Sequence, residues 1–208
     1  MERPIIIIGA GGHAKVLLDT LLNTNKKVLG IIDKQLDKKT PFNIPILGTD
    51  EKLLDFSPDS VKLVNAIGSV ENTIKRAQVF NYFSEKGYEF ANVIHPSAIL
   101  SKQIKLGQGI QVMAGTVLQT DCNIGDNSII NTRASLDHDC SIGPHVHVAP
   151  GVVLSGGVTV GKGSHIGTGA IVIQGIEIGT EATVGAGAIV LSDVPNGVTV
   201  VGVPAKEV

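Results

Sequence analysis

The chain has 208 residues, a formal net charge of −2 and only 3% aromatic residues, with no tryptophan. No run of lysine and arginine forms a basic stripe, which argues against nucleic-acid binding. The apolar run Ile5–Ile8 is far too short for a signal sequence or a membrane span, so we expect a cytoplasmic protein without membrane insertion.

The first part of the chain alternates predicted strands and helices. We expect strands at Pro4–Ile8, Lys27–Asp33, Val61–Ala66 and Glu89–Val93, and helices at Val16–Leu22, near Asp50–Leu54 and at Glu71–Lys86. A polar stretch with two prolines follows the second strand. Two successive β-α-β units of this kind predict a small, Rossmann-like doubly wound α/β domain over residues 1–93.

A glycine-rich turn connects the first strand to the first helix. It reads Gly9-Ala10-Gly11-Gly12-His13-Ala14, and the acidic Asp33 follows at the end of the second strand. This pattern fits the dinucleotide-binding fingerprint, whose glycines let the backbone approach a phosphate at a helix N-terminus. Because the domain is about half of a full Rossmann sheet, a nucleotide-sugar site fits better. A dinucleotide oxidoreductase and a purely structural turn remain the alternatives.

From residue 94 onward the sequence repeats in sixes. Every sixth residue from Ile94 to Val190 is Ile, Leu or Val, and the fifth residue of each hexad is small or aliphatic. This period predicts a parallel β-helix, a three-sided prism in which three hexads close one coil and coils stack ~4.8 Å apart. We expect this β-solenoid to fill residues 94–208, with Pro195–Val208 as a cap on the last coil.

Two further features recur every 18 residues, once per coil. Glycine occupies one corner position of successive coils, where we expect it for its backbone angles; the residues are Gly107, Gly125, Gly143, Gly161 and Gly179. Cys122 and Cys140 stack in the inward fifth position and are expected to be buried, reduced thiols.

The prism has no insertion loops and so no deep pocket of its own. A concave site would have to form where prisms meet, and closed cyclic assembly is the usual way to achieve this. His138 lies in an outward position between Asp137 and Asp139, and a neighbouring carboxylate can hold an imidazole as a general base. The alternative is an exposed surface histidine.

A second group of histidines lies half a coil away. His147 could donate a hydrogen bond to an oxyanion or a cofactor carbonyl. His165 stacks over His147, and His145 is a near neighbour. His138 and His147 face different sides of the prism, so the two can share a site only between two chains.

Several motifs together resemble one known family, the bacterial sialic-acid and bacillosamine-type (NeuD/PglD-like) acetyltransferases of the left-handed β-helix hexapeptide superfamily. The resemblance covers essentially the whole chain. It rests on the segments Ile8–His13, Ala66–Ser69, Ile94–Ala98, Ile130–Thr132, Asp137–Gly143, His147–Gly151 and Val201–Lys206.

The resemblance implies a left-handed prism, homotrimeric assembly and three active sites between neighbouring prisms. The implied reaction is acetyl transfer from acetyl-CoA to the amino group of a nucleotide-linked amino-deoxy sugar of the UDP-4-amino-sugar type, in bacterial glycan synthesis. The thioester is already activated, so no metal is required.

The resemblance also implies a role for each matching residue. His138 would be the general base, oriented by Asp139. His147 of the adjacent subunit would contact the thioester region of acetyl-CoA. The remaining positions are Gly156, Thr168 and Ala186 along the pantetheine, Asn131 in the acceptor pocket, Gly11, Gly12 and His13 at the phosphates, and Asp33 and Gly68 at the base and ribose.

Three alternatives stay open from the sequence. One is a trimeric carbonic-anhydrase-type enzyme with zinc held by His138, His147 and His165. Another is a non-enzymatic scaffold that binds sugar nucleotides. Within the acetyltransferases, the acceptor could instead be a hydroxyl group of a sialic acid.

Overall fold

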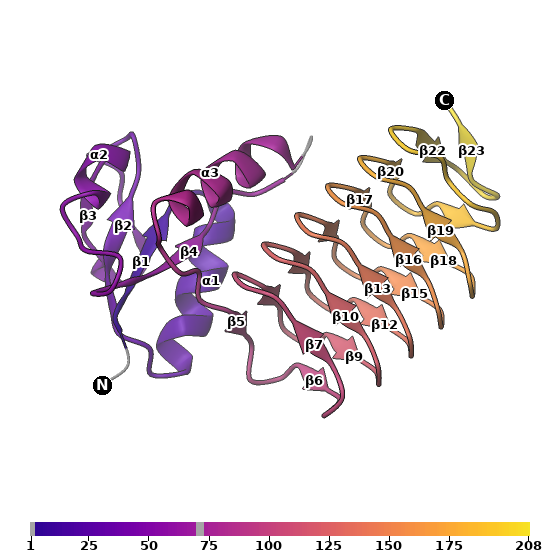
Figure 1. Ribbon diagram of the computed structural model, residues 1–208, viewed down its shortest axis with the longest axis horizontal. Helices are drawn as coiled ribbons and strands as arrows, with labels where there is room; N and C mark the ends of the chain where they lie inside the picture. The colour runs from indigo at the N-terminus through magenta and orange to yellow at the C-terminus, as the bar shows by residue number, and fades with distance from the viewer. Residues whose placement is uncertain (1–2, 70–72) are drawn as a thin grey trace.

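The computed structural model describes residues 3–69 and 73–208 and shows an α/β unit at one end of a long three-sided β-prism (Figure 1). The sheet of the α/β unit is parallel, with the strand order β3-β2-β1-β4. Its elements are β1 (Ile5–Ile8), α1 (Gly12–Asn23), β2 (Val28–Ile32), a 3-10 turn (Pro41–Asn43), β3 (Ile46–Gly48), α2 (Asp50–Leu53), β4 (Lys62–Asn65) and α3 (Ile74–Glu85).

Strand β1 consists of four buried isoleucines because both faces of the sheet are covered. Successive side chains of a strand point to opposite faces. Ile5 and Ile7 belong to the apolar cluster that contains the inner face of α1. Ile6 and Ile8 belong to the cluster that contains the phenylalanines of α3. A continuous apolar run is typical of a parallel strand buried on both sides.

The structure confirms most predicted elements of this unit and corrects two. The edge strand β3 was not predicted, since Pro41 and Pro45 made its surroundings look like a loop. The predicted strand Glu89–Val93 is divided: Phe90 forms a single bridge with Leu63 of the sheet, and Val93 pairs instead with the prism. The start of the helix predicted at Glu71 lies outside the described residues.

The chain leaves the sheet at Asn92, whose side chain bonds to the first coil of the prism. Its Nδ2 donates to the Gly107 carbonyl at 3.0 Å, and its Oδ1 accepts from the Ile110 amide at 2.9 Å. The next residues form β5 (Val93–Ile94), which pairs with β8 of the prism. The expected domain boundary at 93/94 falls within this strand, and the division into 1–93 and 94–208 stays a prediction.

The left-handed prism consists of three sheets built from two- and three-residue strands, which are parallel except for the last pair of strands at the C-terminus. The sheet beside the α/β unit holds β5, β8 (Gln111–Val112), β11 (Ile129–Ile130), β14 (His147–Val148), β17 (His165–Ile166), β20 (Thr183–Val184), β22 (Thr199–Val201) and β23 (Lys206–Glu207). A second sheet, the apolar sheet, holds β6 (Ile99–Leu100), β9 (Val117–Leu118), β12 (Ser135–Leu136), β15 (Val153–Leu154), β18 (Ile171–Val172) and β21 (Ile189–Val190). The third sheet holds β7 (Lys105–Leu106), β10 (Asn123–Ile124), β13 (Ser141–Ile142), β16 (Thr159–Val160) and β19 (Glu177–Ile178).

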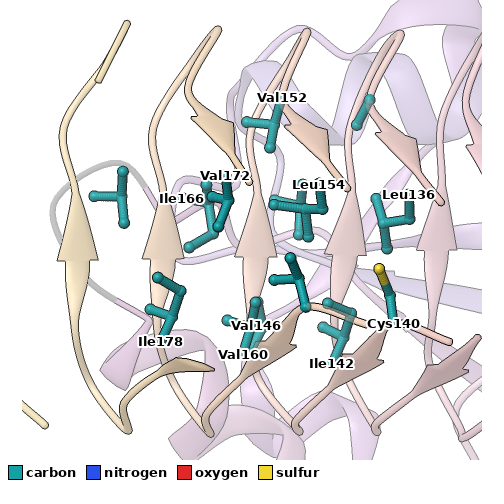
Figure 2. Packing of buried hydrophobic residues seen from close by; sticks show 14 of the residues in the cluster. Leu136, Cys140, Ile142, Val146, Val152, Leu154, Val160, Ile166, Val172 and Ile178 are labelled. Carbon is teal, nitrogen blue, oxygen red and sulfur yellow. The ribbon is translucent and has the colours of Figure 1, made fainter. Parts of the chain in front are cut away.

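Strand pairing confirms the 18-residue coil, as in the pair Asn123 and Ser141. The first residues of the hexads fill the interior in one continuous core, together with the small fifth residues (Figure 2). Cys122 and Cys140 lie in this core as free, buried thiols, as expected.

The last coil departs from the hexad count and covers the open end of the prism. Val194 pairs with Ile178, only 16 residues earlier, so this coil is two residues shorter than the others. The Gly202 carbonyl accepts from the Ile189 amide of β21 at 3.0 Å. Strand β23 pairs antiparallel with β22. The end of the chain thus bonds to the last strand of each of the three sheets.

The corner glycines are required for a reason other than the one expected from the sequence. None of Gly107, Gly125, Gly143, Gly161 and Gly179 has a positive φ. Instead the next coil passes so close that a Cβ atom would meet it. At Gly161 that atom would lie 2.5 Å from the backbone nitrogen of Thr180. Close stacking of coils, not backbone freedom, fixes glycine at this corner.

We predict that Gly161→Ala destabilises the protein by ~1–3 kcal/mol, the usual cost of overpacking a rigid site. Gly12→Ala is the matched control, because a Cβ there meets nothing within 4 Å. Since Gly12 is helical, its replacement by alanine should be neutral or slightly stabilising. Denaturant unfolding of both variants checks this, and equal stabilities would contradict the steric account.

Candidate active site

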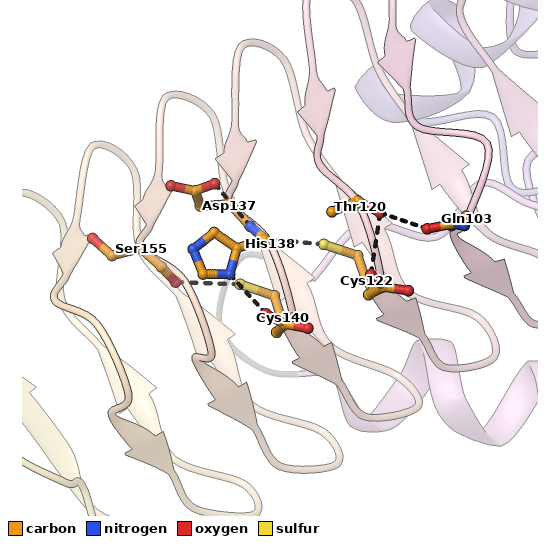
Figure 3. A network of polar contacts seen from close by, with 9 residues as sticks. Gln103, Thr120, Cys122, Asp137, His138, Cys140 and Ser155 are labelled. Carbon is orange, nitrogen blue, oxygen red and sulfur yellow. Dashed lines mark hydrogen bonds and ion pairs between the residues drawn. The ribbon is translucent and has the colours of Figure 1, made fainter.

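His138 lies on the prism corner between β12 and β13, and two neighbouring carboxylates hold it there. Asp139 turns the chain with a left-handed backbone, φ 61°, a conformation that aspartate tolerates better than most residues. Asp137 Oδ1 accepts the backbone N–H of His138 at 2.8 Å (Figure 3). Asp139 Oδ2 lies 2.7 Å from Nδ1 of the imidazole.

The imidazole of His138 rests against Gly156, one coil further along the same column. A Cβ atom at Gly156 would lie 2.5 Å from Cε1 and 2.6 Å from Nε2 of the ring. Gly156 was expected on the pantetheine path with Thr168 and Ala186, but within one chain it lies beside His138 on another corner. Only glycine leaves room for the ring in this orientation.

The contact with Asp139 sets the protonation of His138. A carboxylate only accepts, so Nδ1 carries the hydrogen and Nε2 keeps a free lone pair. The hydrogen bond that the ring donates to Asp139 raises the pKa of His138 above the ordinary value, with the charge of Asp137 adding to it. With its side chain 49% exposed, the ring can accept a proton from a molecule bound at the corner.

A second candidate region is a groove of about 460 Å³ along the sheet beside the α/β unit and its adjoining corner. It is lined by Ser69, His147, Thr168 and Ala186, among others. Three of the four residues expected at acetyl-CoA therefore lie together in one chain. His138 lies elsewhere on the prism, as expected.

His147 is held on both ring nitrogens within its own chain. Nδ1 lies 2.7 Å from Ser69 Oγ, and Nε2 lies 3.1 Å from Asn131 Nδ2. The His165 ring stacks on it edge to face, with centroids 5.0 Å apart, which confirms the predicted column. Burial, together with His165, lowers the pKa of His147 to about 3, so its imidazole is neutral at physiological pH.

The glycine turn lies at the carboxyl edge of the α/β sheet. Gly11 and Gly12 are exposed at the start of α1, and Gly68 follows the neighbouring strand β4. A Cβ at any of these three would meet nothing within 4 Å, so the space beside them is open. Asp33 closes this turn by accepting the Ala10 amide at 2.7 Å. Such an edge is where open α/β sheets bind ligands.

His13 lies apart from this open space, between the α/β unit and the prism. Its Nε2 lies 2.6 Å from Oε1 of Gln111 on β8. Burial lowers the pKa of His13 to about 4, which keeps the ring neutral. Because the amide oxygen of Gln111 only accepts, the one hydrogen of the neutral ring lies on Nε2, and Nδ1 has none to donate to a phosphate.

A polar layer that was not predicted from the sequence is buried between the two units. Arg76 of α3 is fully buried, and its guanidinium donates to the carbonyls of Asn65 at 2.6 Å, Ile67 at 3.0 Å and Asn127 at 3.2 Å. Burial lowers the pKa of Arg76 to about 9. A single arginine in a helical pattern normally marks a solvent-facing position, so no sequence signal pointed to this role.

The described residues also bear on two further questions, a metal site and a membrane-spanning helix. Within residues 3–69 and 73–208, no three His, Cys, Asp or Glu side chains gather as a metal site would require. His138 is on a different corner from the pair His147 and His165, so a zinc ion held by all three would have to lie between two chains. In the same ranges, no helix has the length and apolar character needed to cross a bilayer.

Comparisons with known proteins agree with the two-part architecture. The PglD N-terminal domain model matches residues 4–83, and the bacterial transferase hexapeptide model (six repeats) matches residues 121–156. Among curated protein sequences, no significant match is found.

Solved structures resemble the chain over its full length. A histidine-to-asparagine mutant of perosamine N-acetyltransferase from Caulobacter crescentus, in complex with CoA and GDP-perosamine, is 37% identical with a TM-score of 0.93, covering 100% of this chain and 98% of the other. The acetyltransferase domain of PglB from Neisseria gonorrhoeae, in complex with acetyl coenzyme A, is 36% identical with a TM-score of 0.92 and full coverage of both chains. WeeI from Acinetobacter baumannii is 27% identical with a TM-score of 0.89, again with full coverage.

We predict that Asp139→Asn lowers the pKa of His138, because the charged acceptor on Nδ1 is lost. Asp137→Asn is the matched control. Its carboxylate bonds to the backbone N–H and not to the ring, so the pKa should fall less. Histidine NMR titration of the three proteins measures both shifts. A larger effect from Asp137 would contradict the proposed orientation of the ring.

Proposed function

Because the chain belongs to the NeuD/PglD-like acetyltransferases of the hexapeptide superfamily, and is thus an acetyl-CoA-dependent sugar N-acetyltransferase, we propose that it acetylates a nucleotide-linked 4-amino-deoxy sugar with His138 as general base. The observation that carries the proposal is the His138–Asp139 pair, which leaves Nε2 without a hydrogen in the neutral ring of a side chain that is 49% exposed on a prism corner.

The reaction needs one proton to be moved. The sugar amine attacks the thioester carbonyl, a C–N bond forms, and the bond from carbon to sulfur breaks. His138 Nε2 takes the proton from the attacking amine and returns it to the departing CoA sulfur. Asp139 accepts from Nδ1–H throughout and stabilises the imidazolium that forms.

We assign the acetyl-CoA donor to the groove of a neighbouring subunit. His147 lies beside the thioester region, and Thr168 and Ala186 follow the pantetheine. Gly156, which packs against His138, contributes to the same site from the other side. The 36% identical PglB domain with bound acetyl coenzyme A supports this donor.

We assign the nucleotide of the acceptor to the open edge of the α/β sheet. Gly11 and Gly12 meet the phosphates with backbone amides at the start of α1, where partial positive charge favours an anion. Asp33 and Gly68 hold the base and ribose. We place His13 behind this turn, where its Nε2–H is donated to Gln111 and supports the start of α1 rather than binding a phosphate directly. Asn131 lines the pocket of the sugar.

The apolar sheet lies between the corner that carries His138 and the corner that borders the groove. These two corners must come together from neighbouring subunits, so the apolar character of the sheet supports a homotrimer. Its outward side chains are Ile99, Val117, Ser135, Val153, Ile171 and Ile189, and three of them are 39–65% exposed. The equivalent positions of the third sheet are polar or charged: Lys105, Asn123, Ser141, Thr159 and Glu177. Exposed apolar surface of this kind marks an interface.

The apolar sheet runs from the corner that carries Asn131 and Thr168 to the corner that carries His138. Three copies of this sheet packed around an axis bring the His138 corner of one subunit to the groove of the next. The active site is then complete only in the assembly.

We propose a UDP-linked acceptor, and a GDP-linked one is the second candidate. The GDP-linked acceptor is a candidate because the 37% identical enzyme was solved in complex with GDP-perosamine. A sialic-acid hydroxyl would require no nucleotide at the glycine turn.

The test is release of CoA thiol with UDP-, GDP- and dTDP-linked 4-amino sugars and with free sialic acid. We expect turnover with the UDP-linked amine and a product that carries an amide. His138→Ala should lower turnover ~10²–10⁴-fold and leave acetyl-CoA binding nearly intact. His95→Ala, a histidine outside both regions, is the control. An active His138→Ala enzyme or exclusive turnover of sialic acid would refute the assignment.

We predict that Val153→Asp breaks the trimer, since three carboxylates would be buried near the interface. Thr159→Asp is matched to it, because Thr159 holds the same hexad position on the third sheet. Light scattering after gel filtration should give a smaller mass for Val153→Asp alone, with loss of acetyl transfer. A fully active Val153→Asp monomer would exclude a shared active site.

A further inference from the structure

One hydroxyl connects the turn that follows β4 to the prism groove. Ser69 is only 2% exposed, and its Oγ lies 2.7 Å from Nδ1 of His147. Its carbonyl oxygen lies 3.4 Å from the same nitrogen. Ser69 comes directly after Gly68, at the edge where the proposed nucleotide lies.

The hydrogen bonds around Asn131 determine how the imidazole is protonated. Asn131 Oδ1 accepts the backbone N–H of Thr132 at 2.8 Å, so its amide nitrogen points toward His147. An amide nitrogen only donates, so Nε2 of His147 must be the unprotonated acceptor. The ring is buried and neutral, and its hydrogen therefore lies on Nδ1 and is donated to Ser69.

The position of Ser69 is itself fixed. Arg76 donates to the carbonyls of Asn65 and Ile67, which flank the start of the turn. Asn65 Oδ1 accepts the Ile67 amide at 3.2 Å. These bonds fix the start of the turn within the α/β unit, and Arg76 also donates to the Asn127 carbonyl of the prism at 3.2 Å, which fixes the turn relative to His147.

From this chain of contacts we propose that Ser69 is a positioning residue for acetyl transfer. It fixes His147 as the Nδ1–H tautomer, and that tautomer holds the Asn131 amide in the acceptor pocket. The turn that receives the nucleotide is thereby coupled to the pocket that receives the sugar. The kinetic part of this inference rests on the proposed function, whereas the tautomer does not.

A tautomer can be measured without any substrate. Long-range ¹H–¹⁵N spectra of the full-length protein with ¹⁵N-histidine distinguish protonated from unprotonated ring nitrogens, and His147→Gln identifies the signal by its loss. We expect Nδ1–H and a bare Nε2 in the wild type, and a mixture of tautomers in Ser69→Ala. An Nε2–H tautomer in the wild type would overturn the inference even where nucleotide-sugar acetylation is established.

The kinetic comparison uses Thr73→Val as the matched variant. Thr73 also donates a hydroxyl from the α/β unit to the prism, at 2.9 Å to the Gly163 carbonyl, but it does not touch His147. Ser69→Ala should lower kcat roughly 10- to 100-fold through misalignment, with little change in either KM. Ser69→Thr, which keeps the hydroxyl, should recover most of the rate.

Equal rates for Ser69→Ala and Thr73→Val would overturn the positioning role. Both variants must show the wild-type mass, so that a general loosening of the interface is separated from loss of the His147 contact.

Discussion

Up to the shortened last coil, each coil of the prism is hydrogen-bonded to the next at a register of 18 residues, and this pairing arranges the side chains in columns. The neighbours of a residue within its column determine which side chain fits at that position. At one corner the next backbone passes so close to Gly143 that no side chain fits. At another, the same spacing places Gly156 beneath the ring of His138. A rigid repeat thus allows a histidine to project from the surface in a defined orientation.

The α/β unit is attached to this prism through a buried polar layer as well as an apolar contact, in which Met113 of the prism packs into the cluster that contains α1. The guanidinium of Arg76 is buried without a carboxylate partner among the described residues, which costs several kcal/mol of solvation. Three backbone carbonyls compensate part of that cost, and the one that lies on the prism, that of Asn127, can do so in only one relative placement of the two units. A polar layer of this type fixes the orientation of the two units more than it increases their affinity. Apolar surfaces remain in contact when they shift, whereas hydrogen bonds require a defined geometry.

The fold could be predicted from the sequence almost completely, and the site only in part. Hexads and glycine turns are local and repetitive, so periodicity revealed them. The same periodicity placed His138 outward and stacked His165 on His147, which the structure confirms. The partners of His13 and His147 could not be found in this way, because Gln111 and Ser69 come from distant segments. Periodicity also misassigned the corner glycines, since a repeat shows that small residues are needed but not whether sterics or φ requires them.

The shortened final coil has a consequence for how the molecule behaves at high concentration. A stack of parallel strands ends in unpaired backbone groups, which are a ready template for another chain to continue the stack. Here the returning C-terminal segment takes up those groups on all three faces, with Val194 against Ile178, Gly202 against Ile189, and β23 beside β22. The C-terminal segment therefore opposes end-to-end growth of the prism into fibres at this end.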